Sequence, residues 1–158
     1  MSPAPDNTVI MEGVRIIFRN FSGKEGQYNR EGDRNFAVLL DEKTADIMGT
    51  DGWNVKMLKA RDDEEGSSPQ AYLPVAVNFR GRPPRIVMIT SRNRTNLKES
   101  QVETLDWVDI INVDLIVRPY EWTVNGKSGI KAYLQSMYIR IEEDPLEAKY
   151  SELDRERA

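Results

Sequence analysis

The chain of 158 residues contains no cysteine and no histidine. Without cysteine there is no disulfide framework and no thiolate site for metal or redox chemistry, which fits a reducing compartment. Without histidine the commonest general base and metal ligand is missing, so a histidine-based triad or a two-histidine zinc site cannot be built. We therefore predict that the protein is not an enzyme and that it needs no cofactor.

Long hydrophobic runs are also missing. No stretch approaches the roughly 20 apolar residues that a membrane span needs. Residues 1–7 hold two prolines and one acid, but no basic segment followed by an apolar one, so we expect no signal peptide. These features predict a soluble, cytoplasmic protein with no membrane partner.

Carboxylates are the remaining groups that could hold a metal. The spacing that comes closest to a site is Asp106, Asp109 and Asp114, with Glu103 nearby. Magnesium requires such groups to converge on one octahedral ion, and two of these residues fit a turn and an edge strand equally well. We predict no metal site, and a carboxylate-metal nuclease is the third of three alternatives for function.

Hydrophobic and polar residues alternate along most of the chain, which is typical of strands buried on one face. The pattern predicts strands over Thr8–Arg19, Arg34–Leu40, Trp53–Lys59, Tyr72–Arg80, Arg85–Ser91, Ile110–Trp122 and Ile130–Ile141. It also predicts a short helix over Lys43–Met48, capped by Asp41 and stopped by Gly49. Helical turns are expected within Glu99–Val108, and loops over Asn20–Asp33 and Arg61–Pro69.

Two tight connections predict hairpins. Gly81–Pro84 would join the strand that ends at Arg80 to the strand that begins at Arg85, and Asn125–Gly126 with Lys127–Gly129 would join the last two strands. A mainly β fold follows, for which we favour an antiparallel, five-stranded OB-type barrel with an added hairpin and one or two short helices. Periodicity alone leaves a jelly roll or an Ig-like sandwich open, so the choice of a barrel depends on function.

The positive charge is concentrated, although the whole chain has a net charge of -4. Between Gly66 and Lys98 there is no acidic residue, and aromatic and asparagine residues are interleaved with the bases. The bases of this run are Arg80, Arg82, Arg85, Arg92, Arg94 and Lys98. Basic residues mixed with aromatics on strands follow a phosphate backbone and stack bases. The run therefore predicts a protein that binds single-stranded nucleic acid.

Acidic residues are concentrated at the C-terminal end of the chain. Residues 1–141 hold 19 bases and 19 acids, whereas Glu142–Asp154 holds six acids and one base, Lys149. We expect a nucleic-acid-binding domain over residues 1–141 and an acidic segment over 142–158. This segment is either a solvated terminus or a tail that occupies the basic groove until nucleic acid displaces it.

Several segments in order resemble the single-stranded DNA-binding proteins of tailed bacteriophages. They are Tyr28-Asn29, Arg34-Asn35-Phe36, Gly52–Lys56, Tyr72–Phe79 with Pro83-Pro84, Asn112–Leu115, Arg118–Tyr120 and Lys131–Leu134. The resemblance implies an OB-fold, the cytoplasm of the infected cell, a role in DNA replication or recombination, and an acidic C-terminus that recruits replication proteins. Here Arg155–Ala158 stands in place of an acidic end that finishes in an aromatic residue.

The functional hypothesis is sequence-independent binding of single-stranded DNA by a basic groove with stacking aromatics. DNA rather than RNA depends on the resemblance. The nucleic-acid-binding residues that we predict are Arg34, Lys56, Tyr72, Asn78, Arg80, Arg82, Arg85, Arg92, Arg94, Lys131 and Tyr133. The alternative from another class is a phage structural β-protein whose basic patch meets an acidic partner surface.

Overall fold

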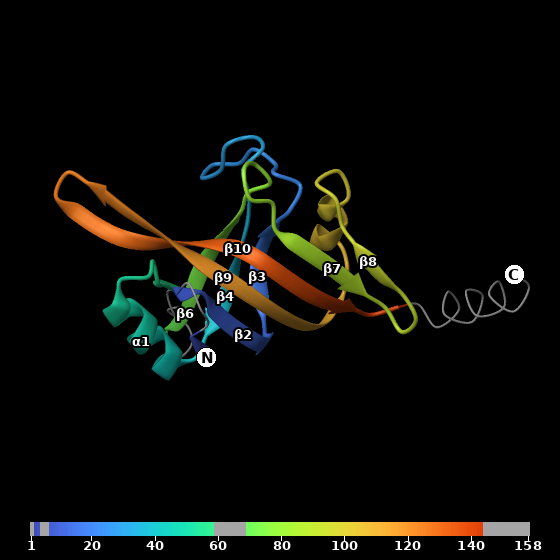
Figure 1. The fold of residues 1–158 in the computed structure, drawn as a ribbon, viewed down its shortest axis with the longest axis horizontal. Helices are drawn as coiled ribbons and strands as arrows, with labels where there is room; N and C mark the ends of the chain where they lie inside the picture. The colour runs from blue at the N-terminus through green and yellow to red at the C-terminus, as the bar shows by residue number, and fades with distance from the viewer. Residues whose placement is uncertain (1, 4–6, 59–68, 144–158) are drawn as a thin grey trace, which may run out of the picture.

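The computed structural model describes residues 2–3, 7–58 and 69–143. These residues form a mainly β protein with ten strands in one mixed sheet (Figure 1). The strands are β1 (Ser2–Pro3), β2 (Val9–Val14), β3 (Ile16–Asn20), β4 (Arg34–Leu40), β5 (Lys56–Leu58), β6 (Gln70–Val77), β7 (Arg85–Ile89), β8 (Arg94–Asn96), β9 (Ile110–Val124) and β10 (Lys127–Ile141). The helices are α1 (Glu42–Asp51) and the 3₁₀ helix η2 (Val102–Asp106).

The strand order of the sheet is β1-β2-β9-β10-β6-β4-β3, with β5 on β6, and with β7 on β10 and β8. Strands β2 and β3 lie far apart in this order, yet Arg15 alone separates them along the chain. Because one continuous segment pairs with β9 and then with β4, the sheet must curl around its core. In Figure 1 the long β9–β10 hairpin crosses the molecule and extends beyond the rest of the sheet as an arm.

The predicted fold class is confirmed, but the predicted barrel architecture is not. The protein is mainly β and has short helices, but the sheet is open and mixed instead of a five-stranded antiparallel barrel. Strand β10 runs parallel to both β6 and β7. The predicted hairpin between Tyr72–Arg80 and Arg85–Ser91 is wrong, because β7 leaves β6, joins β10 and forms its antiparallel pair with β8. The hairpin at Asn125–Gly126 is confirmed.

Helix α1 begins where the sequence predicts. The Asp41 carboxylate accepts a hydrogen bond from the Thr44 backbone N–H at 2.7 Å, which satisfies one free donor of the first turn. This bond holds the pKa of Asp41 below its ordinary value. The helix runs past the predicted stop at Gly49 and ends at Asp51, and Gly52, with a left-handed φ of 101°, is its C-cap.

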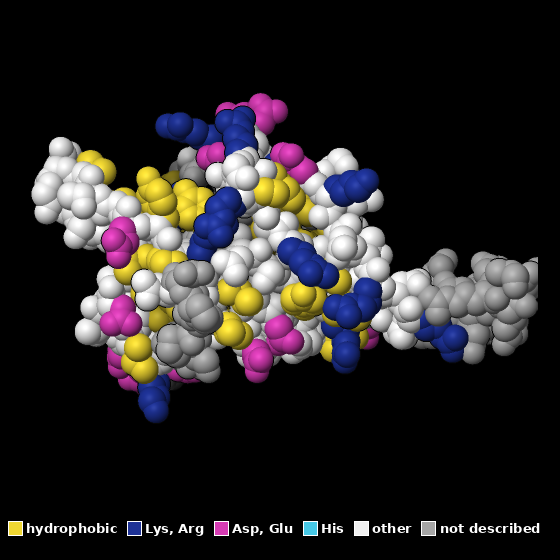
Figure 2. Space-filling model, in the orientation of Figure 1, with side chains coloured by type: hydrophobic (Ala, Val, Ile, Leu, Met, Phe, Trp, Pro, Cys, Tyr) yellow, Lys and Arg dark blue, Asp and Glu magenta, His cyan; other side chains and the backbone are white. Residues whose placement is uncertain are grey.

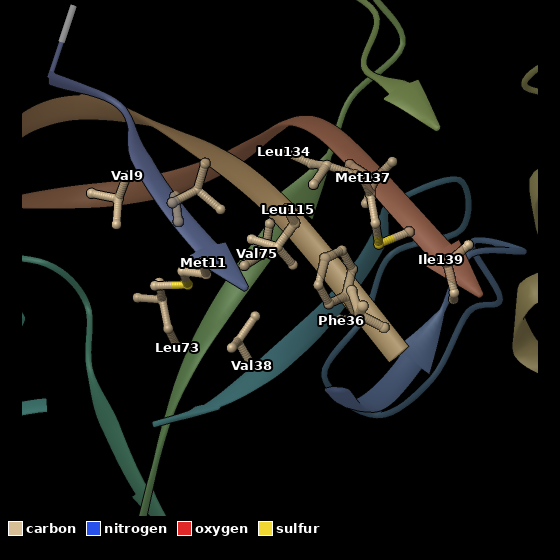
Figure 3. Close-up of a cluster of buried hydrophobic side chains, with 14 of the residues drawn as sticks. Val9, Met11, Phe36, Val38, Leu73, Val75, Leu115, Leu134, Met137 and Ile139 are labelled. Carbon is tan, nitrogen blue, oxygen red and sulfur yellow. The ribbon is translucent and has the colours of Figure 1, made fainter. Parts of the chain in front are cut away.

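The core lies inside the curled sheet and includes residues from every long strand (Figure 3). Phe36, Leu73, Val75, Leu115, Leu134 and Met137 are at most 2% exposed. The alternation of β6 is as predicted, since Leu73, Val75 and Val77 are buried. Trp53 is also in the core, but Met57, which the sequence places on the same face, is 55% exposed because β5 covers only Lys56–Leu58 at the sheet edge.

A β-bulge divides β10. Leu134 pairs with Val117 and Ser136 with Ile116, so Gln135 is an extra residue without an opposite partner on β9. A bulge shifts the alternation of side chains by one position. Buried residues are therefore even-numbered before it and odd-numbered after it, namely Ala132, Leu134, Met137 and Ile139. The outer face accordingly carries Lys131 and Tyr133 on one side of the bulge and Tyr138 and Arg140 on the other.

No helix within the described residues is long and apolar enough to cross a membrane. The predicted helical turns in Glu99–Val108 are η2. The segment between Ser91 and Glu99 contains β8, a strand that the sequence analysis did not identify. Most of the predicted loop Arg61–Pro69 and of the acidic segment 142–158 lies outside the described residues.

Candidate nucleic-acid interface

A cleft of about 970 Å³ lies on the outer face of the sheet. Its floor is formed by the central strand β6, with β4 on one side and β10 on the other. The strand register places Asn35, Ala76 and Tyr133 in one row across these three strands, and Arg118 of β9 continues the row beyond Tyr133. The cleft therefore crosses the strands, and each strand contributes outward-facing side chains to it.

Tyr133 is the centre of a basic and aromatic group at one end of the cleft. The Nζ atom of Lys131 lies 5.3 Å from its ring centroid, and Cζ of Arg118 lies 5.8 Å from it. Tyr120 meets the same ring edge-on, with centroids 5.7 Å apart. We call these four residues the Tyr133 cluster. It combines positive charge with a partly exposed aromatic ring, which is the pair of properties that nucleotides need from a stacking site.

Trp122 lies next to this cluster, and the position of its ring requires a glycine at residue 129. A Cβ atom built on Gly129 would approach the Trp122 ring to 2.8 Å, so the indole lies directly on the backbone of the opposite strand. Trp122 is 37% exposed and lines the cleft. Any larger residue at position 129 would move the indole, and with it one wall of the cleft.

Phe18 and Tyr72 form the aromatic pair at the β3 side. Their rings meet edge-on, with centroids 5.6 Å apart. The sequence alternation groups Phe18 with Val14 and Ile16 on one strand face, but Val14 and Ile16 pack against the core whereas Phe18 is 58% exposed. The pairing of β3 with β4 shifts between Ile17 and Asn20, and Phe18 has a left-handed φ of 54° that turns its ring outward.

The charges in the cleft are mixed. Its lining includes the bases Arg34, Arg80 and Lys131 and the acids Glu31, Asp33 and Glu99. Arg34 is engaged within the protein, since its Nη1 atom lies 3.1 Å from Glu99 Oε1 and its Nε donates to the Phe21 carbonyl. Its guanidinium also lies 5.7 Å from the Phe79 ring. Arg34 therefore stabilises the rim, and Arg80 and Lys131 are the bases with the greater freedom to meet a ligand.

Two arginines meet at the edge of the Tyr133 cluster. Nη2 of Arg118 is 3.5 Å from the backbone carbonyl of Arg82, and burial, followed by the charge of Arg82, lowers the pKa of Arg118 from its ordinary value. The charge of Arg82 lies close enough to act on Arg118, and an anion such as a phosphate would relieve the repulsion between the two.

The loop between β3 and β4 forms a wall of the cleft and is tied down by side chains. Asp106 accepts hydrogen bonds from the Phe21 and Ser22 N–H groups, at 2.7 and 3.1 Å. Asn29 Oδ1 accepts from Nδ2 of Asn35, which joins the loop to the cleft floor. At the base of the loop Gly23 has a φ of 72°, and a Cβ there would lie 3.0 Å from the Gly32 backbone.

Two of the carboxylates considered for a metal have separate structural partners. Asp106 holds the β3–β4 loop, and Asp114 accepts a hydrogen bond from the Gly13 N–H at 2.8 Å. Across the described ranges, no three residues of the metal-binding types come together as a site.

Figure 2 shows how charge is distributed over one face of the protein. Lysine and arginine side chains lie across the middle of this face and over β7 and β8, whereas most acidic side chains lie toward its margins. On this face the basic side chains therefore form a central band.

Residues 3–157 match the family described as "Putative phage ssDNA-binding domain". The chain belongs to this family. The match covers nearly the whole chain and confirms the resemblance noted from the sequence segments. No curated protein sequence matches the chain.

Solved structures show the same relationship at the level of the fold. The single-stranded DNA-binding protein from bacteriophage Enc34 in complex with ssDNA matches with a TM-score of 0.55 and 12% identity, over 87% of this chain and 88% of that one. Its C-terminal truncation matches with a TM-score of 0.52 and 12% identity over the same shares. A further structure of the Enc34 protein matches with a TM-score of 0.51 and 13% identity, over 87% of this chain and 83% of that one.

The cleft brings together a little over half of the residues predicted for this family member. Those that line it are Arg34, Tyr72, Asn78, Arg80, Lys131 and Tyr133. Lys56 lies beside it, opposite Tyr72 in the β5–β6 pairing, and Arg82 lies at its edge next to Arg118. Arg85, Arg92 and Arg94 lie apart from it on β7, β8 and the turn between them.

Sequence reasoning missed four residues of this surface: Phe18, Arg118, Tyr120 and Trp122. Three of them could have been found, because Val113, Leu115 and Val117 alternate as core residues and the opposite parity of β9 carries Arg118, Tyr120 and Trp122. Phe18 had no such signal, since a bulge reverses its direction.

Proposed function

We propose that this family member binds single-stranded DNA in the cleft, with phosphates on its bases and nucleobases on its aromatic rings. The observation that carries the proposal is the Tyr133 cluster, in which one partly exposed ring lies within 6 Å of two cations. Stacking on such a ring is worth about 1 to 3 kcal/mol per base. Arg82 and Arg118 would hold a phosphate at the edge of the cluster, and Arg80 with Lys131 would hold the strand inside the cleft.

The proposed binding does not read sequence. The rings of Tyr72, Tyr133 and Phe18 offer faces or edges to any base, and bases of every kind have a π-face. The single α-helix of the described chain, α1, lies beside β6 at the far end of the sheet and contributes no side chain to the lining of the cleft. Discrimination between bases would need hydrogen-bonding groups placed against base edges, as in a recognition helix.

The test is fluorescence anisotropy with labelled single strands and duplexes of the same length, across a range of salt concentrations. We expect tighter binding of the single strand and an affinity that falls steeply as salt rises, because bound phosphates release counterions. Equal affinity for both forms, or no dependence on salt, would contradict the proposal. The structural β-protein alternative predicts indifference to oligonucleotides.

For the cellular role we propose that the protein protects single strands during phage DNA replication or recombination, in the cytoplasm of the host. The family assignment supports a general coating role, as does a cleft whose described lining includes no recognition helix. An OB-type origin of the sheet is part of this proposal, supported by the curl of β2 and β3 around the core. In vitro, strand exchange or primer extension on a template with secondary structure should become faster when the protein is added.

We also propose that residues 142–158 are a separate acidic segment that competes with DNA for the basic surface and recruits replication or recombination proteins. Its support is charge: seven acids and three bases fall in this segment of a chain whose remainder is neutral. Deleting it should tighten DNA binding, most at low salt, since the Debye length is about 8 Å at physiological ionic strength. Weaker binding with a lower melting temperature would contradict the competing tail.

A further inference from the structure

The outer face of β10 continues beyond the cleft, and there it again carries a tyrosine with an arginine against its ring. After the bulge at Gln135 the outward residues are Ser136, Tyr138 and Arg140. Cζ of Arg94, on β8, lies 5.7 Å from the Tyr138 ring centroid, a geometry close to that of Arg118 on Tyr133. Two tyrosines with arginine partners therefore lie on the same face of one strand.

The register of β7 adds a third arginine. Arg85 pairs with Ser136, so it lies on the outer face between the two tyrosines and is exposed. Arg140 pairs with Ile89, and Ile89 in turn with Arg94. We call Arg85, Arg94, Tyr138 and Arg140 the Tyr138 patch.

One residue of the outer face, next to Tyr138, is buried. Val87 lies in one row with Tyr138 on β10 and Asn96 on β8, and it faces outward, away from Ile86 in the main core. Even so, Val87 is only 1% exposed. Its row neighbours Tyr138 and Asn96 flank it on the same face, and the Arg94 guanidinium in turn lies against the Tyr138 ring.

The acids that border the patch have other partners. Asp114 is opposite Tyr138 on β9, and its carboxylate accepts the hydrogen bond from the Gly13 N–H. Glu143, after the end of β10, accepts a hydrogen bond of 2.6 Å from the Ser91 hydroxyl. The patch has three arginines against these two bordering acids, whereas the lining of the cleft has three basic and three acidic residues.

We propose that the Tyr138 patch is a second contact site for the same DNA strand, which leaves the cleft at Tyr133, passes Arg85 and stacks a base on Tyr138. The proposal rests on the proposed function and deepens it. Tyr133 and Tyr138 are five residues apart on an extended strand, roughly 16 Å. Phosphates between the two stacked bases would meet Arg85, and those beyond would meet Arg94 and Arg140.

The experiment compares oligothymidylates from about 4 to about 16 nucleotides, the range of site sizes of single OB folds. The full-length protein should gain affinity in two stages, the second when the strand becomes long enough to reach Tyr138. Tyr138→Leu, which keeps an apolar side chain over Val87, should remove the second stage. We expect a loss of about 5- to 150-fold for long strands and no change for the shortest strand that fills the cleft.

Two further variants separate the contribution of base stacking from the contribution of phosphate contacts. Tyr138→Phe keeps the ring and is the matched control, with unchanged affinity at every length. Arg85→Ala with Arg94→Ala removes two exposed charges, and should lower the slope of log K against log salt by about 1.4 for long strands only. The control for this pair is Arg15→Ala with Lys43→Ala, the same change of charge on exposed residues outside both surfaces.

The outcomes distinguish the two proposals. If the unmodified protein binds no single strand of any length, the proposed function fails and the second site with it. If it binds, but Tyr138→Leu and the double arginine variant lose no more affinity for long strands than for short ones, the second site is wrong and the cleft stands. Should Tyr138→Leu fail to fold, the exposed arginine pair decides by the same comparison of lengths.

Discussion

The two faces of β10 differ in every property that matters for folding and binding. The inner face is apolar and at most 1% exposed: Ala132, Leu134, Met137 and Ile139. The outer face is basic and aromatic: Lys131, Tyr133, Tyr138 and Arg140. The contrast teaches that one strand can provide the core and the binding surface together, provided that its alternation is corrected once, at Gln135.

The most severe test of this division is to delete Gln135. Without the extra residue, the segment after it must either face the wrong way or slip in register against β9, which would move Met137 and Ile139 toward solvent. We expect no cooperative unfolding transition in urea, followed by circular dichroism. Gln135→Ala keeps the residue count and should stay within about 0.5 kcal/mol of the unmodified protein. A deletion variant with an unchanged midpoint would show that the bulge is dispensable.

Leu134→Ala tests the inner face alone. Leu134 is 1% exposed, so its truncation removes buried methyl groups and leaves a cavity. The free energy of unfolding should fall by about 2 to 5 kcal/mol. Measured at a temperature where the variant is still folded, its DNA affinity should match that of the unmodified protein. A loss of affinity without a loss of stability would mean that the two faces are not independent.

Tyr133→Ala is the counterpart on the outer face, one residue away. Loss of the stacking ring should weaken single-strand binding by about 1 to 3 kcal/mol, by a similar factor at every salt concentration, since stacking releases no ions. Anisotropy titrations at three salt concentrations measure this. Tyr133→Phe is the control and should bind normally. If Tyr133→Ala is insoluble or unfolded, the residue belongs to the core instead.

Arg80→Ala with Arg82→Ala separates charge from stacking on the outer face. Each phosphate contact on a single strand contributes about 0.7 to the slope of log K against log salt, so the slope should fall by about 1.4. The affinity loss should be largest at low salt and small at high salt. A uniform loss at all salts, with the slope unchanged, would assign these arginines a structural role.

Asp41→Ala lies away from both faces of β10 and should change stability without changing DNA binding. Removal of the N-cap should cost about 0.5 to 2 kcal/mol. Because the Thr44 hydrogen bond lowers the pKa of Asp41 in the folded state, this stabilisation is full above the unfolded pKa of about 3.9 and is lost as pH falls through the folded value. The difference in unfolding free energy between the two proteins should therefore shrink below about pH 4. Asp41→Asn, another good cap, should show no such pH dependence.

Much of the fold was predictable from local patterns. Strand Arg34–Leu40 was predicted with its observed bounds, and the start of α1 at Asp41 followed from the chemistry of the cap. The last hairpin followed from Asn125–Gly126, whose left-handed φ values of 51° and 78° suit the tight turn. These features depend on residues close together in sequence, and local propensity is enough to specify them.

The sequence was enough to predict the type of candidate site, but only some of its residues. Tyr72, Arg80, Lys131 and Tyr133 could be chosen because strand alternation places them opposite core residues, and the structure brings them to one cleft. Phe18 could not, since a bulge and a left-handed backbone reverse its direction. Arg85 and Arg94 belong to the same basic run as Arg80 but lie elsewhere, because β7 leaves β6 and joins β10.

What the sequence determined by itself is the class of the protein: mainly β, without histidine or cysteine chemistry, with bases and aromatics on the outward positions of its strands. Tertiary structure alone decided which strands are neighbours. The parallel pairing of β10 with β6 and β7 joins residues more than 40 positions apart, and side-chain alternation within one strand carries no information about its partner. For that reason the chemistry of the surface could be inferred from the chain, whereas the path that a DNA strand would take across it depends on the assembled sheet.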